Sequence, residues 1–417
     1  PDVDQAYMTA SQLMTGMGGW PLNVITLPDG SPIYAGTYHT TSQWNDILKR
    51  IVRLKEDNYE GLKEIASNVK NGVKDVNTIQ KEEEISDFNP EFLNSNIEDW
   101  MERWDLEFGG DIAQQKFVSP SKYLFLLNYG RIYKDEKVLS HVKNTLDVIA
   151  SSGLNDFIEG GFYRYTVDNE WKIPHFEKML YDQAQMISLF SMGYKVFGDQ
   201  SFKDIVSNTI LFLSNKMSST DGLYYAAMDA DTDGEEGKYY SYEMDELKMI
   251  SENTDFDLFL SYYNIDVENP WEKNRFLLLP NKFNYEKKWI DSNNVSKKEI
   301  SDLITIWEKN INDIKEDRTK PRIDDKIIVS WNALAIIGLI DAYDAFKNED
   351  YISIAKSMFK ELKDNSYRKG QLIHTYKENQ FQEGVLEDYA YLSKAAMRLF
   401  QATGDISYFD FSKKVID

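Results

Sequence analysis

The sequence predicts a mostly α-helical protein in which a ring of helical hairpins, an α/α toroid, follows a smaller α/β domain. Two observations predict this fold. Apolar helical segments of equal spacing recur late in the chain, and a strand, turn and strand pattern stands near its start. We expect the α/β domain at residues 1–78, a linker at 79–88 and the toroid at 89–417, with an insertion at about 229–320.

The first element is a hairpin. PLNVITL (21–27) and SPIYAGTY (31–38) read as strands joined by the turn PDG. An amphipathic helix should begin at Ser42 as its N-cap, and Pro21 after Trp20 is a candidate cis proline. A helix, a Trp-Pro step, a hairpin and a closing helix make the C-terminal half of a thioredoxin-like fold. Since the chain also starts at Pro1 rather than Met, we expect a processed product or a fragment.

After the charged run KEEEISD (81–87), one helical pattern repeats. Polar residues at 182, 332 and 388 each precede an apolar helix that reaches Gly or Asn sixteen positions later, at 198, 348 and 404. Each copy continues into a second helix and a loop with Gly and aromatic residues, and a weaker copy spans 118–134. We therefore predict inner helices, outer helices and short β-rich loops in alternation.

Parallel inner helices would bring their N-termini to one end of the ring. That end would hold Asp182, Asn332 and Asp388 together with side chains of the loops before them. The loop residues are Trp171, His175 and Glu177, then Asp325 and Trp331, then Glu387. Helix N-termini offer free N–H groups to hydroxyl-rich ligands, so a binding site is expected there. The alternative is that Asp182, Asn332 and Asp388 only cap their helices.

The insertion begins with the acidic run DADTDGEEG. Its alternating carboxylates resemble a calcium loop, but the twelve-residue ligand register ending in Glu is absent. Asp229 and Asp231 therefore either belong to a solvated turn or point into the ring opening. Four scattered histidines without HExxH spacing argue against a transition-metal site, and we predict no metal and no cofactor.

Composition excludes several classes of function. Lys and Arg number 47 against 69 Asp and Glu, and the resulting net charge of −22 disfavours nucleic-acid binding. The chain contains no cysteine, which removes disulfides and thiol chemistry. No apolar run approaches membrane-spanning length, so we expect no membrane partner and a cytoplasmic protein.

Several motifs resemble the thioredoxin-domain-containing proteins related to spermatogenesis-associated protein 20. They are PDVDQAYM and GGWPLNVITLPDGSPIYAGTY in the first domain, and GGFYRYTVDNEWKIPHFEKMLYDQA, DADTDGEEGKYY, RIDDKIIVSWNAL and LEDYAYL in the second. The resemblance implies a thioredoxin-like domain before an (α/α)6 toroid similar to N-acylglucosamine 2-epimerases and other six-hairpin glycosidase-like enzymes. The family's Cys-containing segment is not in this sequence, so no redox role is assigned.

The residues favour a carbohydrate-active protein that binds a small sugar-like ligand. Aromatic faces and hydrogen-bonding carboxylates suit sugars. Epimerisation is the first expectation, with His175 as the base that removes a proton next to a carbonyl, and glycoside hydrolysis by two carboxylates is the second. The candidate catalytic residues are His175, Glu177, Asp182 and Asp388. The candidate binding residues are Arg164, Tyr165, Trp171, Asp229, Asp231, Asp325, Trp331, Asn332 and Glu387.

A non-catalytic binding or scaffold module is the alternative, with the thioredoxin-like part serving recognition of a protein partner. It predicts that the acids pair with Arg164, Lys178 or Arg322.

Overall fold

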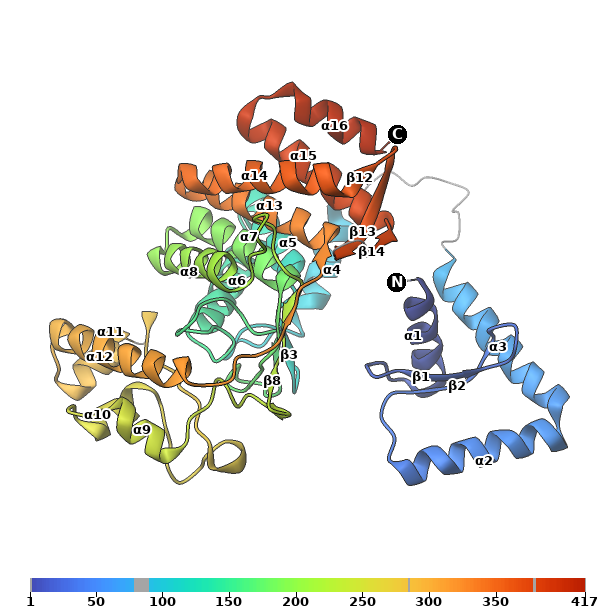
Figure 1. Ribbon diagram of the computed structural model, residues 1–417, viewed down its shortest axis with the longest axis horizontal. Helices are drawn as coiled ribbons and strands as arrows, with labels where there is room; N and C mark the ends of the chain where they lie inside the picture. Colours follow the sequence, from blue (N-terminus) through green and yellow to red (C-terminus); the bar gives the residue numbers. More distant parts are fainter. Residues whose placement is uncertain (1, 79–89, 284–285, 378–379, 417) are drawn as a thin grey trace. The chain divides into compact units, whose positions relative to one another are not determined.

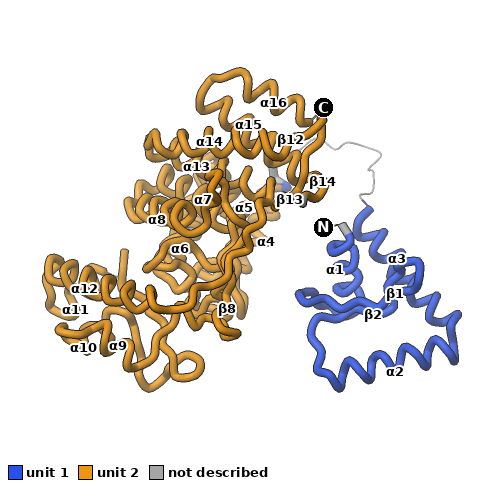
Figure 2. The backbone as a smooth tube through the Cα atoms, viewed as in Figure 1, with its two compact units in different colours: residues 1–92 blue, residues 93–417 orange. Residues whose placement is uncertain are grey.

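A computed structural model describes residues 2–78, 90–283, 286–377 and 380–416. The chain forms two compact units, Pro1–Phe92 and Leu93–Asp417 (Figures 1 and 2). The predicted linker at 79–88 lies outside the described residues. No described helix combines the length and apolar character that a bilayer crossing requires.

Unit 1 is a two-stranded hairpin between helices. Strands β1 (Asn23–Thr26) and β2 (Pro32–Gly36) pair antiparallel, and helices α1 (Asp2–Thr15) and α3 (Tyr59–Asn77) both pack on β2. The peptide bond between Trp20 and Pro21 is cis, as predicted. The hairpin and the cis proline are therefore confirmed.

The helix that follows the hairpin starts earlier than predicted. Helix α2 spans Thr41–Asp57, and its N-cap is Thr40 rather than Ser42. The Thr40 hydroxyl accepts a hydrogen bond from the Gln43 backbone N–H, and the Gln43 side chain accepts one from the Thr40 N–H. This reciprocal capping box satisfies two N–H groups at once, which a cap at Ser42 would not do.

Unit 2 is built mainly from helical hairpins. After α4 (Pro90–Met101), four hairpins follow in pairs: α5 (Pro120–Tyr133) with α6 (Glu136–Ala150), α7 (Leu180–Phe197) with α8 (Gln200–Lys216), α13 (Val329–Phe346) with α14 (Glu349–Ser366), and α15 (Leu386–Thr403) with α16 (Ile406–Ile416). The first helices of the pairs pack side by side in the order α5, α7, α13, α15 (Figure 1). The second helices cover them. The predicted alternation of inner and outer helices, and the mostly α toroid class, are confirmed.

The inner helices also have the predicted equal length. Helices α7, α13 and α15 each contain 18 residues. Gly198 and Gly404 end α7 and α15 in the left-handed conformation, with φ of 71° and 74°. Helix α13 ends at Lys347 instead, and Asn348 is the N-cap of the next helix. The prediction that Asn348 caps α13 is therefore wrong by one residue.

The polar residues at the helix starts are not N-caps. The N-caps of α7, α13 and α15 are Met179, Ile328 and Val385. Asp182, Asn332 and Asp388 consequently lie inside the first turns. From the first turn, Asp388 reaches back to the Val385 N–H and across to the Ser330 N–H of α13, and Asn332 reaches across to the Tyr224 backbone.

Short strands lie before the inner helices, as predicted. The three-stranded sheets are β3 (Lys116–Phe117), β4 (Tyr165–Thr166) and β5 (Pro174–His175), and β6 (Lys178–Met179), β7 (Ala227–Met228) and β10 (Ile323–Asp324). A four-stranded sheet contains β11 (Ile327–Ile328), β12 (Tyr367–Arg368), β13 (Gln371–Lys377) and β14 (Gln380–Glu383). The pairings tie the loops before α5, α7, α13 and α15 to one another at the same end of the helices.

The insertion builds a hydrophobic core of its own. Its elements are β8 (Asp231–Thr232), β9 (Glu235–Glu236), α9 (Met244–Ile250), α10 (Phe256–Tyr262), a 3-10 turn at Glu272–Asn274, α11 (Glu286–Asn293) and α12 (Lys297–Glu316). Aromatic side chains dominate this core, with Trp307 at its centre against Phe259 and Tyr262. The insertion is thus a packed subdomain whose first hairpin, β8–β9, returns to the site described below.

His141 on α6 is a buried histidine without hydrogen bonds. Its ring stacks on Trp104 with centroids 4.0 Å apart, and neither ring nitrogen has a partner among the described residues. Burial lowers the pKa of His141 to about 4. The ring is therefore neutral in the folded protein at pH values where an unfolded histidine is already protonated.

Replacing His141 with phenylalanine should flatten the pH dependence of stability. Because the folded pKa is depressed, the contribution of His141 to stability is present above pH 6.5 and is lost as the pH falls toward 4. Between pH 7.5 and pH 5.0, urea unfolding should show that the free energy of unfolding of the wild type falls by up to about 2 kcal/mol more than that of the variant. Ser140→Ala, exposed on the same helix, is the control. If the free energy of unfolding changed equally between the two pH values in the wild type, His141→Phe and Ser140→Ala, burial of His141 would not have this role.

Candidate functional site

The N-terminal turns of α7, α13 and α15 meet, and we call this place, with the loops before these helices, the helix mouth. Tyr181 on α7 and Trp331 on α13 make an edge contact with ring centroids 4.8 Å apart. The Ser330 backbone N–H donates to Asp388 Oδ1 at 3.0 Å, which joins α13 to α15. The structure therefore brings the first turns of three inner helices together, as the repeat predicted.

Asp182 is the most unusual acid of the helix mouth. Its Oδ2 atom is buried and has no hydrogen-bond partner among the described residues. Burial raises the pKa of Asp182 to about 8, which Arg164 opposes and Glu177 reinforces. Asp182 is therefore a neutral carboxylic acid at pH 7, and it can donate a proton or a hydrogen bond.

Beside Asp182, Arg164 and Glu177 form an ion pair. Arg164 Nη1 donates to Glu177 Oε2 at 3.0 Å, and both side chains are partly exposed. His175 first, and Arg164 second, hold the pKa of Glu177 below its usual value, against the effect of burial. Glu177 is thus a charged carboxylate with partners, unlike Asp182.

His175 lies between two carboxylates. Its Nδ1 is 2.6 Å from Glu236 Oε1, and its Nε2 is 3.7 Å from Glu177 Oε2. Glu177 and Glu236 raise the pKa of His175, although burial acts in the opposite direction. Glu236 comes from β9 of the insertion and was not predicted as a site residue. The only earlier sign of it was its place in the DADTDGEEGKYY motif.

An aromatic stack adjoins His175. Tyr165 stacks on the His175 ring at 4.9 Å and on Phe117 at 4.5 Å. Phe117 is exposed, because β3 carries it out at the edge of the sheet with β4. Such a surface suits the apolar face of a sugar ring. Phe117 was not a predicted site residue, because a single Phe near a turn has no motif of its own.

A second carboxylate and histidine pair lies on the α15 side of the mouth. His374 Nδ1 is 2.9 Å from Asp388 Oδ2 and 3.1 Å from Oδ1. Asp388 is fully buried, whereas Glu387 beside it is exposed and accepts a hydrogen bond from the Ser330 hydroxyl. Asp388 raises the pKa of His374, mainly through this hydrogen bond. His374 was not among the predicted site residues, since its strand β13 is seen only in the structure.

Two predicted binding residues are part of the core instead. Trp171 is fully buried, and its Nε1–H donates to the Phe108 carbonyl at 3.0 Å. Asn332 is also fully buried, and its amide exchanges two hydrogen bonds with the Tyr224 backbone. Both side chains are therefore engaged inside the fold, and their role in substrate binding remains a prediction. A buried amide or indole is retained because it satisfies backbone groups that water cannot reach.

The remaining acids lie in exposed loops. Asp229 and Asp231 are both exposed, and the Asp231 N–H donates to Asp229 Oδ1 within their own turn. Asp325 pairs with Lys377 at 2.6 Å. Of the two alternatives for Asp229 and Asp231, the solvated turn fits these contacts.

A buried ionic cluster lies behind the helix mouth and was not predicted. Lys178 Nζ is 2.6 Å from Asp156 Oδ2, and Lys315 Nζ of α12 is 3.1 Å from Glu159 Oε2. Tyr239 also donates to Glu159, at 2.9 Å. Both lysines and Asp156 are buried. The cluster joins the insertion to the loop before α7, and its charges are mutually satisfied.

The helix mouth also contains donor types found in metal sites. His374, Glu387 and Asp388 have ligand atoms within 4.8 Å of one another. However, the oxygens of Asp388 already accept hydrogen bonds from the N–H groups of Ser330 and Val385 and from His374. These contacts account for the group without an ion, and we assign no metal to it.

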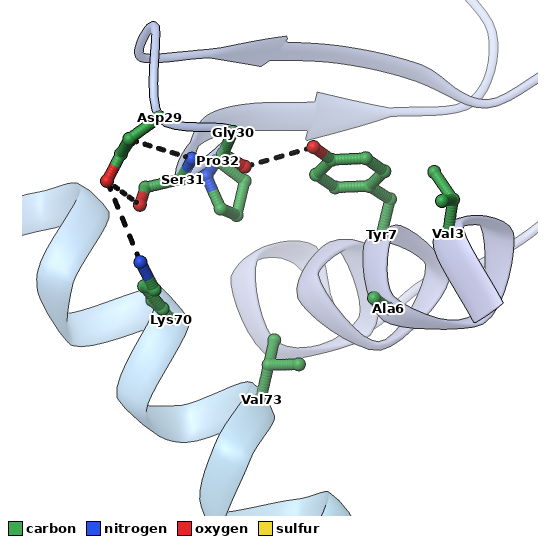
Figure 3. A pocket seen from close by; sticks show the side chains of 9 residues that line it. All are labelled: Val3, Ala6, Tyr7, Asp29, Gly30, Ser31, Pro32, Lys70 and Val73. Carbon is green, nitrogen blue, oxygen red and sulfur yellow. Dashed lines mark hydrogen bonds and ion pairs between the residues drawn. The ribbon is translucent and has the colours of Figure 1, made fainter.

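Two cavities lie away from these residues. In unit 1, a cavity of about 340 Å³ lies between α1, the turn at Asp29–Pro32 and α3 (Figure 3). Its walls are mostly apolar, and Lys70 Nζ lies 3.6 Å from Asp29 at its edge (Figure 3). In unit 2, a cavity of about 550 Å³ is lined by the loops at 107–108, 151–153 and 279–281. Neither cavity contains a predicted catalytic residue.

The sequence matches one family model and several curated proteins. Residues 1–74 match the model Thioredox_DsbH, described as a protein of unknown function, DUF255. An uncharacterized protein of Caenorhabditis elegans is 30% identical over 98% of this chain and 61% of its own length. Spermatogenesis-associated protein 20 of Mus musculus is 26% identical over 100% of this chain and 58% of its own length. The chain therefore spans about three fifths of the length of these relatives.

Solved structures with distant similarity include sugar enzymes. A sugar epimerase from a ruminal bacterium matches with a TM-score of 0.35 and 17% identity, over 76% of this chain and 82% of the other. A family 76 mannosidase from Bacteroides thetaiotaomicron matches with a TM-score of 0.41 and 10% identity, over 71% and 57%. Because both TM-scores are below 0.5, we derive neither fold nor function from these two matches.

Proposed function

Proceeding from a chain that is similar throughout to spermatogenesis-associated protein 20 and begins with a thioredoxin-like unit, we propose that the helix mouth binds a sugar or a similar polyhydroxy compound and transfers a proton at the carbon beside its carbonyl. The observation that carries this proposal is the carboxyl of Asp182, whose buried Oδ2 has no hydrogen-bond partner among the described residues and whose pKa is raised to about 8. A carboxylic acid that is kept neutral near pH 7 is suited to general acid catalysis.

The groups around Asp182 suit a hydroxyl-rich ligand. Phe117 and Tyr165 offer an aromatic face, and Arg164 and Glu177 offer a donor and an acceptor. His175 carries a proton more readily than an ordinary histidine, so we assign it a donor role beside Asp182 rather than the role of base. These roles belong to the proposal.

Proton transfer fits the helix mouth better than glycoside hydrolysis. Hydrolysis needs two available carboxyl groups on either side of the scissile bond. Asp388 is fully buried, and both of its oxygens already accept backbone hydrogen bonds. It can therefore neither attack a sugar nor activate water, so it does not serve as one of the two carboxyl groups that hydrolysis needs.

A non-catalytic binding module remains the second candidate, and the Arg164 and Glu177 pair favours it. Such pairing is what a binding or scaffold protein would show. Asp182 distinguishes the two candidates, because an acid kept neutral and unpartnered has a cost in stability that a pure scaffold has no reason to retain.

Asp182→Asn should lower activity and raise stability together. The folded pKa of Asp182 is raised, so unfolding releases a proton and the stability of the wild type falls as the pH rises from about 4 to 8. Asparagine does not ionise. The variant should therefore be more stable than the wild type at pH 7.5, by roughly 1–4 kcal/mol, and the gain should shrink at pH 5.

The activity is measured as exchange of the C2 hydrogen of D-mannose, N-acetyl-D-glucosamine and cellobiose for deuterium in D2O, followed by NMR. Asp182→Asn should slow the exchange by about 10²-fold or more. Asp204→Asn, exposed on the outer helix α8, should change neither property. Binding of a sugar without any exchange by the wild type would establish the non-catalytic candidate, and neither binding nor exchange would overturn the proposal.

A further inference from the structure

The two histidines of the helix mouth differ in what their ring nitrogens face. Both nitrogens of His175 face carboxylates, Glu236 at 2.6 Å and Glu177 at 3.7 Å. Each ring nitrogen thus has a carboxylate as its neighbour, and a nitrogen that donates its proton to a carboxylate has no lone pair with which to accept another. His175 is therefore poorly suited to remove a proton from carbon.

In His374 only one ring nitrogen is engaged. Nδ1 lies 2.9 Å from Asp388 Oδ2, and within the described parts of the chain the hydrogen bonds of His374 are made by Nδ1. A carboxylate at Nδ1 fixes the tautomer that carries its proton there, and it leaves the lone pair on Nε2. His374 is partly exposed, with a side-chain exposure of 19%.

Asp388 is itself held rigidly. Its carboxylate is fully buried and accepts hydrogen bonds from the Ser330 N–H at 3.0 Å and the Val385 N–H at 2.9 Å. Ser330 belongs to α13, and Val385 is the N-cap of α15. The first residues of two helices thus hold the carboxylate in place, and the carboxylate in turn orients the imidazole. Preorganisation of this kind is what an acid or base needs in order to act without reorganisation.

We infer that His374 is the base of the helix mouth and that Asp388 is the residue that positions it; this rests on the proposed function. Nε2 of His374 takes the proton from the carbon beside the carbonyl of an open-chain sugar. The electron pair of that C–H bond forms the C=C bond of an enediol, and the C=O π electrons move to oxygen. That oxygen receives a proton from Asp182 or His175, and reversal of the steps returns a proton from Nε2 of His374 to the same face of the carbon.

The charge around His374 is consistent with this role. The groups that face the ring are Asp388 and Glu387 of α15, both acidic. They make the imidazole more basic than an ordinary histidine, so the rate of C2 exchange should rise with pH through a value above 6.5. In the same surroundings an anionic substrate, such as a sugar phosphate, would be repelled. The substrate is therefore expected to be uncharged.

The first test needs no activity. The 417-residue chain contains only four histidines, so its NMR spectra contain few imidazole signals. Each signal is assigned by its disappearance in one His→Gln variant. The neutral form of His374 should carry its proton on Nδ1, and Asp388→Asn should lower its pKa. If Asp388→Asn does not fold, the tautomer of His374 in the wild type is still a test. A neutral ring with its proton on Nε2 would overturn the assignment of His374 as the base.

The second test separates this inference from the proposed function. His374→Ala should slow C2 exchange in D-mannose by about 10²- to 10⁴-fold, and free imidazole should restore part of the rate. A histidine with only a structural role would give no such rescue. His39→Gln in unit 1 is the control. If the wild type exchanges and His374→Ala keeps its rate, this inference fails while the proposed function stands. If the wild type does not exchange, the proposed function fails instead.

Discussion

Replacing Lys178 with methionine should lower the free energy of unfolding by roughly 3–5 kcal/mol. The Lys178 side chain is fully buried, and its Nζ donates to Asp156 Oδ2 at 2.6 Å and to the Gly160 carbonyl at 2.9 Å. The faces of Phe212 and Tyr163 also surround the ammonium group, at 4.3 and 4.9 Å. Methionine fills a similar volume but leaves the buried Asp156 carboxylate without its cation.

The pKa of Asp156 explains why the effect should be large. Burial alone would raise it, yet Lys178 and Lys315 hold it well below its usual range. Without Lys178, Asp156 must either remain charged in the core or take up a proton. Either outcome costs free energy in the folded state.

Lys172→Met is the matched control for Lys178→Met. Lys172 also pairs with a carboxylate, Glu170, at 2.5 Å, but its side chain is 60% exposed. Loss of an exposed ion pair should cost less than about 1 kcal/mol. Urea unfolding of the two variants measures the difference, and similar losses for both would show that the cluster behind the mouth is solvated rather than buried.

Trp171→Ala should also cost about 3–5 kcal/mol, and it should do so without a specific loss of sugar affinity. The indole is completely buried and donates to the Phe108 carbonyl at 3.0 Å. Lys116 Nζ lies 5.6 Å from its ring, so alanine would remove a cation–π contact and leave a cavity together with an unpaired carbonyl.

Tyr165→Ala is the comparison for Trp171→Ala. Tyr165 is partly exposed in the stack between Phe117 and His175, so its removal should weaken sugar binding and change stability little. Thermal unfolding and titration with D-mannose test both variants. Loss of affinity in Trp171→Ala at unchanged stability would show that the indole, despite its burial, belongs to the site.

The buried ionic cluster has a consequence for the helix mouth. Lys315 lies on α12 of the insertion and pairs with Glu159, whereas Lys178 stands directly before α7. The same insertion supplies Glu236 to His175. The insertion therefore contacts both the buried ionic cluster and the helix mouth.

The local sequence determined the elements. Sixteen-residue spacings, Gly198 and Gly404 fixed three inner helices of 18 residues, and the PDG turn fixed the hairpin of unit 1. These features depend on helical periodicity, on left-handed glycine and on turn geometry, all of which act over a few residues. The grouping of the inner-helix starts followed because equal repeats place equivalent residues at the same end.

Only the tertiary structure decided which polar and aromatic side chains meet. Trp171 was predicted as a binding residue and Phe117 was not, yet Trp171 is fully buried and Phe117 is exposed. His374 became a site residue through strand β13, and Asp182 became a neutral acid through burial. Burial, partner choice and pKa depend on contacts between segments far apart in the chain, and no local pattern records them.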